Sequence, residues 1–397
     1  MTRQYPVDEY PLLKGRKRRW LRLRYFLIPL LLVIVSMFFF PDIKGGAEIF
    51  QERIPTVAKR DLMRIDPTTI KQKNLTIDWG LQKFIAETSA KYKLYYGAIV
   101  VMDAHTGDIL ALYGKRPSGQ DCSVGLDTDL AASIFKIVTA VAALDQAGMT
   151  SESMLSYTGK AHTLYKNQLT GKRYRWSADI SLADAFAHSN NIVFAKIGTL
   201  CLRETPIFLT ALKMGFWKSP LKECECTPST LFFPQTDYNL AELACGFNRQ
   251  TKISPLHAAQ MVTAVTNKGC MVTPRLVRSS DVEQIQVMSE EVARHLGTMM
   301  ERTVRVGTVA KTFRRMSSDK VLRQLNIGAK SGSIDGDDPK GRRNWFVGYA
   351  DNPTTGEAIS IGCLLVRDDY FWIEADTLSK LIIRYYFSKQ ATVAQIN

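Results

Sequence analysis

Segments that favour β-strands stand at the two ends of the folded part of this chain, and a long helical stretch separates them. Residues 96–103 and 108–113 are apolar runs rich in β-branched or aromatic residues, and the turn His105-Thr106-Gly107 between them predicts a hairpin. Three further strand-like runs follow near the end, at residues 327–333, 345–350 and 359–366. Residues 115–324 are mostly helical in pattern. This order predicts an α+β fold, with a five-stranded, mainly antiparallel sheet that joins both chain ends, flanking helices and an inserted all-helical lobe.

Two helices are predicted to flank this sheet. Asp78 begins the first, which has Leu81, Phe84 and Ile85 on one face. The second is amphipathic and runs from about residue 376 to 387. These elements set the expected folded domain at residues 75–397.

The first 74 residues divide into three segments of different composition. Residues 1–24 carry eight Lys/Arg and two acidic residues, and this charge of +6 is a large part of the chain's +14. Residues 25–40 carry no charge, which predicts a transmembrane helix, although 16 residues fall just short of the usual length of about 17–25. Residues 41–74 are polar, contain three prolines and predict a stalk.

The basic tail beside the apolar segment indicates a membrane rather than nucleic acid as its partner. The positive-inside rule places residues 1–24 in the cytoplasm and the domain outside the cytoplasmic (inner) membrane, in the periplasm. A cleaved signal peptide is the alternative, but Phe38-Phe39-Phe40-Pro41 is a poor cleavage site.

Seven cysteines follow the apolar segment. Outside the cytoplasm some of them could pair, and an odd number leaves at least one without an intramolecular partner. Cys224-Glu225-Cys226 resembles half of a metal site, but no second close Cys or His pair completes it. We therefore expect no metal and no cofactor.

Ser133 and Lys136 are one helical turn apart at the start of an apolar helix. The chain contains two other S-x-x-K matches, but one includes Pro220 and the other, residues 317–320, is wholly polar. Only Ser133 begins a strong apolar pattern, which ends at Gly148. Residues three apart share a helix face, and burial disfavours the ammonium form of Lys136. A neutral Lys136 amine could then activate the Ser133 hydroxyl as a nucleophile.

Two later motifs could complete a pocket with this pair. Ser189-Asn190-Asn191 follows an apolar-periodic stretch, and Lys330-Ser331-Gly332-Ser333 lies on a predicted strand. Taken alone, the first is typical of a helix N-cap and the second of a turn. In a pocket, Ser189 could relay a proton, the Asn191 amide could hold Lys136, and the strand could bind a peptide edge to edge.

The three motifs match the S-x-x-K, S-x-N and K-[ST]-G set of serine enzymes that penicillin acylates. From about Leu75 onwards, the chain resembles the transpeptidase domain of penicillin-binding proteins. The resemblance also rests on the segments Leu75-Thr76-Ile77-Asp78, Met102 to Ala111, Gly307-Thr308 and Trp345-Phe346-Val347-Gly348-Tyr349.

This resemblance implies a D,D-transpeptidase that cross-links the cell wall. Ser133 would attack the penultimate D-alanine carbonyl of a peptidoglycan stem peptide, with Lys136 as general base and Ser189 and Asn191 completing the relay. Lys330, Ser331, Gly332 and Ser333 would form the substrate-binding strand, with the terminal carboxylate on the lysine and the two hydroxyls. The backbone N–H groups of Ser133 and Ser333 would hold the oxyanion. β-Lactams would be trapped as a Ser133 ester.

Three departures from the family pattern are visible. Residues 41–74 are too few for the glycosyltransferase or large non-catalytic module that family members usually carry, so we expect a separate glycan polymerase as partner. Ser331 and Ser333 replace threonines that are frequent in the family. Residues 246–249 depart from a glycine-richer segment, which affects the expected loop shape.

Other functions remain open at this point. A D,D-carboxypeptidase or endopeptidase would share the chemistry and differ in the acceptor. A class A β-lactamase would need a second base, for which Glu225 is the obvious carboxylate but lacks an Asn at position 229. A class D-like β-lactamase with a carboxylated Lys136, or a non-catalytic penicillin-binding scaffold, are further alternatives. Arg342 and Arg343, near the predicted pocket edge, could attract anionic wall polymer or lipid, but a solvated hairpin tip is the preferred interpretation.

Overall fold

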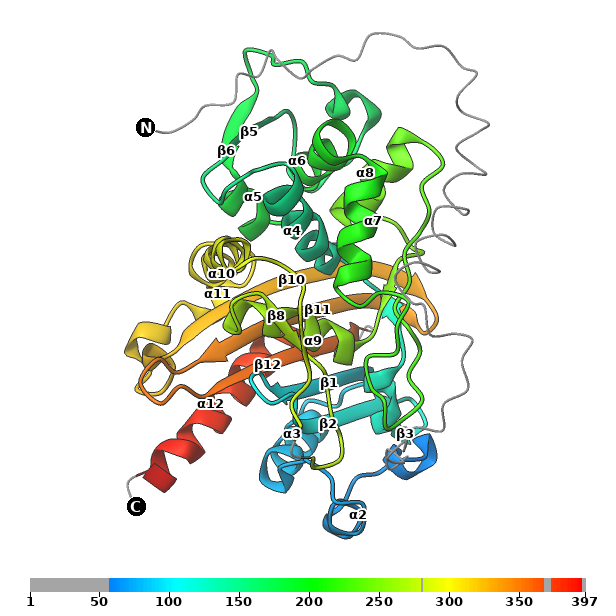
Figure 1. Cartoon of the computed structure of the whole chain (residues 1–397), viewed down its shortest axis with the longest axis vertical. Helices are drawn as coiled ribbons and strands as arrows, with labels where there is room; N and C mark the ends of the chain where they lie inside the picture. Colours follow the sequence, from blue (N-terminus) through cyan, green and yellow to red (C-terminus); the bar gives the residue numbers. More distant parts are fainter. Residues whose placement is uncertain (1–56, 280, 368–372, 395–397) are drawn as a thin grey trace, which may run out of the picture. The chain divides into compact units, whose positions relative to one another are not determined.

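A six-stranded antiparallel sheet organises the computed structural model, which describes residues 57–279, 281–367 and 373–394 (Figure 1). The strands follow the order β10-β11-β12-β1-β2-β3. Their bounds are β10 Asn326–Asp337, β11 Lys340–Asp351, β12 Ala358–Arg367, β1 Tyr96–Asp103, β2 Ile109–Arg116 and β3 Gly119–Gln120. β1 pairs with β12 from Tyr96↔Val366 to Asp103↔Ile359, so the front and back strands form one sheet, as predicted.

The predicted count of five strands is wrong by one. The sixth strand, β3, is two residues long and pairs with the end of β2. Two residues cannot show the alternation of apolar and polar side chains by which strands are recognised in a sequence.

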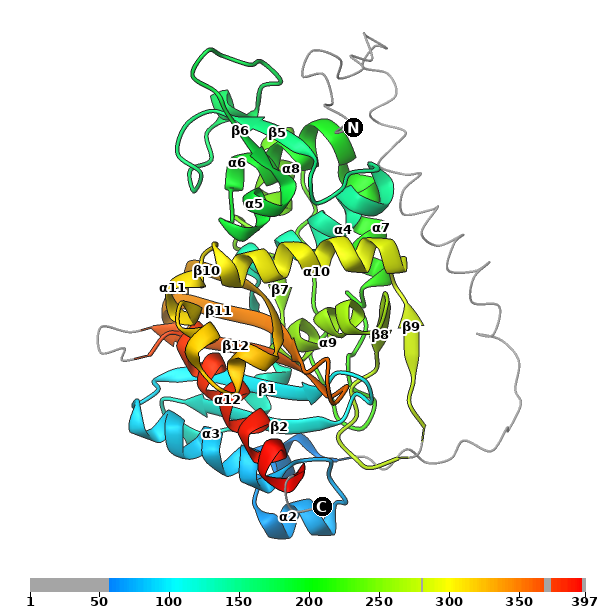
Figure 2. The same cartoon turned by 90° about the vertical axis from the view of Figure 1, so that its left-hand side faces the viewer.

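Helices cover both faces of the sheet (Figure 2). The helices α3 (Trp79–Lys91) and α12 (Ala375–Ala394) pack with one set of alternating strand residues, among them Ile99 and Val101 of β1. Asp78 caps α3, as its sequence predicts, by accepting a hydrogen bond from the N–H of Leu81. The helix α9 (Pro255–Thr266) covers the other face. Burial on both faces explains why β1 and β12 read as continuous apolar runs.

The inserted lobe is mainly helical. It contains α4 Lys136–Gln146, α5 Leu182–Ala187, α6 Asn191–Lys196, α7 Glu204–Lys213 and α8 Asp237–Cys245. Phe135, Phe186, Phe194 and Phe216 are fully buried in its core. The helix α10 (Glu290–Arg305) contacts both this lobe, through α4 and α5, and the sheet, through β10.

The expectation of an all-helical lobe is wrong in one respect. A two-stranded sheet of β5 (Met154–Tyr157) and β6 (Ala178–Ser181) lies on it. Two more short strand pairs lie between β3 and β10 in the sequence. They are β4 (Asp129–Leu130) with β7 (Lys252–Ile253) and β8 (Cys270–Val272) with β9 (Gln284–Gln286). Strands of two to four residues are too short to be distinguished from loops by their pattern.

Short helical segments complete the described chain. They are η2 Lys59–Leu62, α2 Pro67–Gln72, η3 Cys122–Leu126, η4 Ala132–Phe135, η5 Lys166–Leu169, the π-helical η6 Ile197–Leu202, α11 Ala310–Phe313, η7 Met316–Ser318 and η8 Leu322–Gln324. Val57, Leu62 and Ile65 are buried in the same cluster as β1 and β2 residues, so this part of the predicted stalk packs on the domain.

The predicted cytoplasmic tail, transmembrane segment and residues 41–56 lie outside the described residues. Within the described part, none of the helices combines the length and the apolar character needed to cross a bilayer. All seven cysteines lie in the described ranges and are free thiols.

The interpretation of Arg343 as part of a solvated tip is wrong. Its side chain is 1% exposed, and its guanidinium lies 2.8 Å from the carboxylate of Asp129. It also donates hydrogen bonds to the carbonyl oxygens of Asp338, Pro339 and Gly341. Arg343 therefore links the β10–β11 turn to β4 by an ion pair and hydrogen bonds. β4 ends two residues before η4, the segment that carries Ser133.

Candidate active site

Ser133 lies in the single turn η4, which leads directly into α4. The sequence predicts a helix starting at Ser133, and the structure has a 3₁₀ turn there, with the α-helix starting at Lys136. Ala132 before it has a positive φ of 49°, a conformation that is uncommon for residues other than glycine. The Ser133 side chain is partly exposed, while Lys136 is completely buried. Their Oγ and Nζ atoms lie 2.9 Å apart.

Lys136 has two further partners, and both are hydrogen-bond acceptors. Its Nζ donates to Oδ1 of Asn191 at 2.8 Å and to the carbonyl oxygen of Cys245 at 2.7 Å. Burial lowers the pKa of Lys136 to about 8. A neutral amine has two N–H bonds and one lone pair. The two carbonyl oxygens can take both N–H bonds, which leaves the lone pair for the Ser133 hydroxyl proton.

The Ser189-Asn190-Asn191 motif forms the turn between α5 and α6. Ser189 has a positive φ of 54°, and Asn190 caps α6 by accepting a hydrogen bond from the N–H of Val193. Asn191 donates its side-chain amide to the carbonyl oxygen of His162 at 3.0 Å and its backbone N–H to that of Ala161. These two bonds fix the amide so that Oδ1 faces Lys136.

Lys330 on β10 is completely buried and joins the sheet to the lobe. Its Nζ lies 3.1 Å from Oγ of Ser189 and donates to the carbonyl oxygen of Ser331 at 2.7 Å. Burial, and then the charge of Lys136, lowers its pKa well below the usual value. The expectation grouped Lys330 with the carboxylate-binding hydroxyls, but its amine lies deeper, beside Ser189.

The rest of the β10 motif faces the entrance of the site. The Ser331 hydroxyl lies 2.5 Å from that of Thr308, and the exposed Ser333 hydroxyl accepts a hydrogen bond from Arg342 at 2.9 Å. A Cβ on Gly332 would lie 3.2 Å from the Ser133 nitrogen, which shows that the strand passes close to the segment that carries the nucleophile. β10 is an edge strand, so its free edge can add a peptide strand.

The three motifs, far apart in sequence, therefore meet in one site. Sequence reasoning missed the Cys245 carbonyl as an acceptor for Lys136 and Arg342 as a partner of Ser333. Gly246 was noted only as part of a divergent loop. It has a φ of +69°, and a Cβ there would come within 2.0 Å of the Ala132 carbonyl oxygen, so it allows α8 to approach Ser133 closely.

The residues considered for other chemistry do not join this site. Glu225 is exposed, and Ser229 is buried with its hydroxyl 2.7 Å from Nδ1 of His257. Within the described ranges, no group of three or more His, Cys, Asp or Glu side chains is arranged to hold a metal ion.

Comparison with known proteins agrees with this geometry. Residues 97–363 match the family described as "Penicillin binding protein transpeptidase domain". Penicillin-binding protein PbpB of Mycolicibacterium smegmatis is 23% identical over 340 residues, which cover 78% of this chain and 48% of that protein. The chain thus spans about half the length of this curated relative.

Solved structures share the fold at low sequence identity. The ceftriaxone acyl-enzyme complex of penicillin-binding protein A from M. tuberculosis has a TM-score of 0.61 and 20% identity, covering 78% of each chain. A peptidoglycan glycosyltransferase from Burkholderia ambifaria has a TM-score of 0.62 and 20% identity, covering 81% of this chain and 98% of the other. The family match spans more than half of the sequence, and the chain therefore belongs to the penicillin-binding protein transpeptidase family.

Proposed function

We propose that this protein is a membrane-anchored peptidoglycan D,D-transpeptidase that forms an acyl-enzyme on Ser133. The observation that carries the proposal is the buried Lys136 amine, 2.9 Å from the Ser133 hydroxyl and held from its other side by two carbonyl oxygens. This arrangement supplies a general base next to a nucleophile, as acyl transfer requires.

The first half-reaction begins when Lys136 takes the Ser133 proton. The Ser133 oxygen attacks the carbonyl of the penultimate D-alanine, and the backbone N–H groups of Ser133 and Ser333 stabilise the oxyanion. The C–N bond then breaks, and the leaving amine of D-alanine receives the proton from Lys136 through the Ser189 hydroxyl. Ser331 and Ser333 bind the terminal carboxylate, and the positive charge of Arg342, which donates a hydrogen bond to Ser333, favours this anion.

In the second half-reaction the ester is transferred to an amine. The amine of a neighbouring stem peptide attacks the ester carbonyl, and the bond between this carbonyl carbon and the Ser133 oxygen breaks. The amine proton passes through the same relay to the Ser133 oxygen, which restores the hydroxyl and leaves an amide cross-link. A β-lactam enters the first step in the same way, but its leaving nitrogen stays attached to the acyl group, which keeps the acceptor out and makes the ester long-lived.

The β-lactamase alternatives gain no support from the site. A class A-like mechanism needs a second base, and Glu225 is exposed without a contact to Ser133 or Lys136. A carboxylated Lys136 would place an anion against the Cys245 carbonyl oxygen, which now accepts a hydrogen bond from Nζ. Fixed acceptors there favour an amine instead.

The cellular setting is part of the proposal. The uncharged segment 25–40 anchors the protein in the cytoplasmic membrane, with the catalytic domain in the periplasm. Residues 41–74 leave no room for a glycosyltransferase between this segment and the domain, so a separate polymerase supplies the glycan strands.

The test uses a synthetic pentapeptide stem as donor and an amine acceptor, with products resolved by mass spectrometry. We expect released D-alanine together with the cross-linked product, and neither with S133A. Release of D-alanine without cross-linking, at saturating acceptor, would identify a carboxypeptidase. Continuous turnover of nitrocefin, instead of a stoichiometric burst, would identify a β-lactamase.

A further inference from the structure

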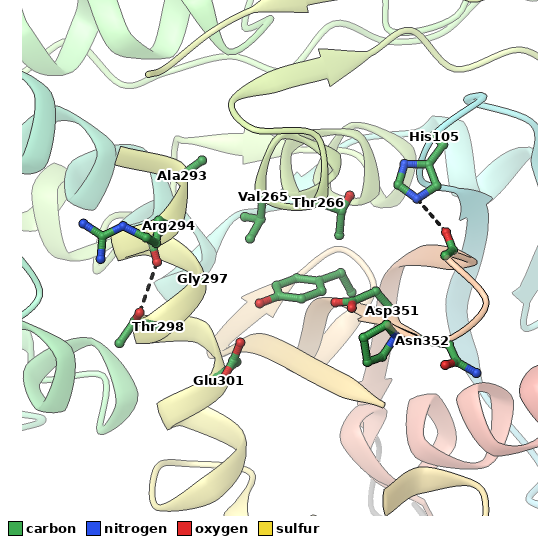
Figure 3. A pocket seen from close by; sticks show the side chains of 13 residues that line it. His105, Val265, Thr266, Ala293, Arg294, Gly297, Thr298, Glu301, Asp351 and Asn352 are labelled. Carbon is green, nitrogen blue, oxygen red and sulfur yellow. Dashed lines mark hydrogen bonds between the residues drawn. The ribbon is translucent and has the colours of Figure 1, made fainter. Parts of the chain in front are cut away.

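A cavity lies at the end of β11, outside the proposed active site (Figure 3). Its volume is about 450 Å³, within the usual range for small-ligand sites of roughly 300–1,000 Å³. One side is the α10 face that carries Ala293, Gly297 and Glu301, and the other is formed by Tyr349 and Asp351.

Two carboxylates line this cavity, and each has one oxygen without a donor among the described residues. Glu301 accepts a hydrogen bond from Arg305 at 3.0 Å on Oε2, and Asp351 accepts one from Asn326 at 3.0 Å on Oδ2. Neither donor lines the cavity. Burial raises the pKa of both carboxyl groups, and the charge of Asp351 adds to this effect on Glu301.

Tyr349 adds a polar group that has no partner in the described part of the chain. Its side chain is 3% exposed, yet its hydroxyl makes no hydrogen bond there. Gly297 faces it closely, since a Cβ at this position would lie 3.4 Å from the hydroxyl oxygen. Burial, followed by the charges of Glu301 and Asp351, raises the pKa of Tyr349. The phenol therefore lies in a negative potential.

Two further polar side chains line the cavity, His105 and Arg294, and in the described part of the chain neither forms a hydrogen bond with Glu301 or Asp351. His105 uses both ring nitrogens elsewhere, with Nδ1 2.7 Å from Oδ1 of Asn267 and Nε2 3.1 Å from the carbonyl oxygen of Gly356. Arg294 is exposed, and its guanidinium points away from the space between Glu301 and Asp351 (Figure 3).

We propose that this cavity binds a small organic amine, with its ammonium group between Glu301, Asp351 and the Tyr349 hydroxyl. A primary ammonium has three N–H donors, and the cavity offers three free acceptors, the second oxygen of each carboxylate and the phenol oxygen. Val265 and Ala293 give the methylene groups of such a ligand an apolar wall. A metal ion fits less well, because the described residues contain no cluster of three acidic, His or Cys ligands.

Isothermal titration of the full-length protein with cadaverine tests this proposal, with 1,5-pentanediol as the uncharged analogue of equal length. We expect saturable binding of cadaverine and none of the diol. E301Q and D351N should each weaken binding about tenfold, the loss typical of one hydrogen bond to a charged group, and Y349F by a smaller factor.

The matched control is E291Q, which lies on the exposed side of the same helix and does not line the cavity. It should bind cadaverine like the wild type. Labelling of Ser133 by fluorescent penicillin verifies that each variant is folded, since no altered residue belongs to that site. Absence of saturable cadaverine binding, equal binding of the diol, or wild-type affinity in both E301Q and D351N would overturn the proposal. None of these outcomes depends on whether the protein is a transpeptidase.

Discussion

The Nζ atom of Lys136 lies 2.9 Å from Oγ of Ser133, at a place where the lysine side chain is entirely buried. The pKa of Lys136 is lowered to about 8 by this burial. Below pH 8 the residue is mainly an ammonium ion, which has no lone pair to accept the Ser133 proton. Above pH 8 it is mainly a neutral amine, which can act as the base.

The rate of β-lactam acylation should therefore rise with pH. We expect an increase of about tenfold per pH unit well below pH 8 and a plateau above it, as for a single essential base. Stopped-flow measurement of acylation by nitrocefin between pH 6 and 9.5 checks this, in the range where circular dichroism shows an unchanged fold. A rate that is constant or that falls over this interval would contradict a neutral Lys136 as the base.

Asn190 and Asn191 are adjacent and buried, but only Asn191 contacts Lys136. N191A removes an acceptor that orients the base, and we expect acylation to slow by about 10²-fold, at the low end for disturbed general-base catalysis. N190A removes the cap of α6 and should cost about 1 kcal/mol of stability instead.

Thermal unfolding and acylation rate per folded molecule separate the two effects. N190A should lower the melting temperature and keep most of the acylation rate. N191A should lose most of the acylation rate, with a smaller change in melting temperature. Equal loss of acylation in both variants would mean that the Asn191 amide only supports the fold.

Gly246 and Gly148 both have positive φ angles, but their surroundings differ. A Cβ at Gly246 would lie 2.0 Å from the Ala132 carbonyl oxygen, and one at Gly148 would meet nothing within 4 Å. G148A should cost only the strain of a left-handed conformation, about 1–2 kcal/mol. G246A must also displace the segment before Ser133, so we expect a larger loss of stability and a strong fall in acylation.

Urea unfolding and penicillin labelling of the two variants test this difference. If G246A acylates as fast as G148A, the close approach of α8 to the Ser133 turn is not needed to position the nucleophile.

The site was predictable from the sequence to the extent that its chemistry is carried by side chains in short motifs. The spacing of Ser133 and Lys136 implied their contact, and the strand pattern located Lys330. The Cys245 carbonyl was not predictable, because any residue type offers the same backbone oxygen and only the tertiary fold brings it to Lys136. The depth of Lys330, next to Ser189, depends in the same way on how the lobe sits on the sheet.

The overall fold followed from the long apolar strands at both ends of the domain. The strand β3 and the small sheets of the inserted stretch were missed, because two to four residues carry no periodic signal. Arg343 was misread because the sequence does not show that Asp129, 214 residues earlier, lies beside it.

The ion pair of Arg343 and Asp129 should be important for stability. Both partners are buried. D129N therefore leaves the Arg343 guanidinium with an uncompensated positive charge, and R343M leaves the Asp129 carboxylate with an uncompensated negative charge. We expect each variant to lose about 3–5 kcal/mol. The exposed pair of Arg173 and Asp179 is the control, and D179N should cost under about 1 kcal/mol. Urea unfolding monitored by tryptophan fluorescence measures both, and equal losses would contradict a structural role for the buried pair.

The most direct measurement is mass spectrometry of the protein after incubation with penicillin. We predict one adduct of the mass of the intact antibiotic, located by proteolysis on the peptide that contains Ser133, and none in S133A. An adduct on another residue, or unmodified wild-type protein that circular dichroism shows to be folded, would contradict Ser133 as the nucleophile activated by Lys136.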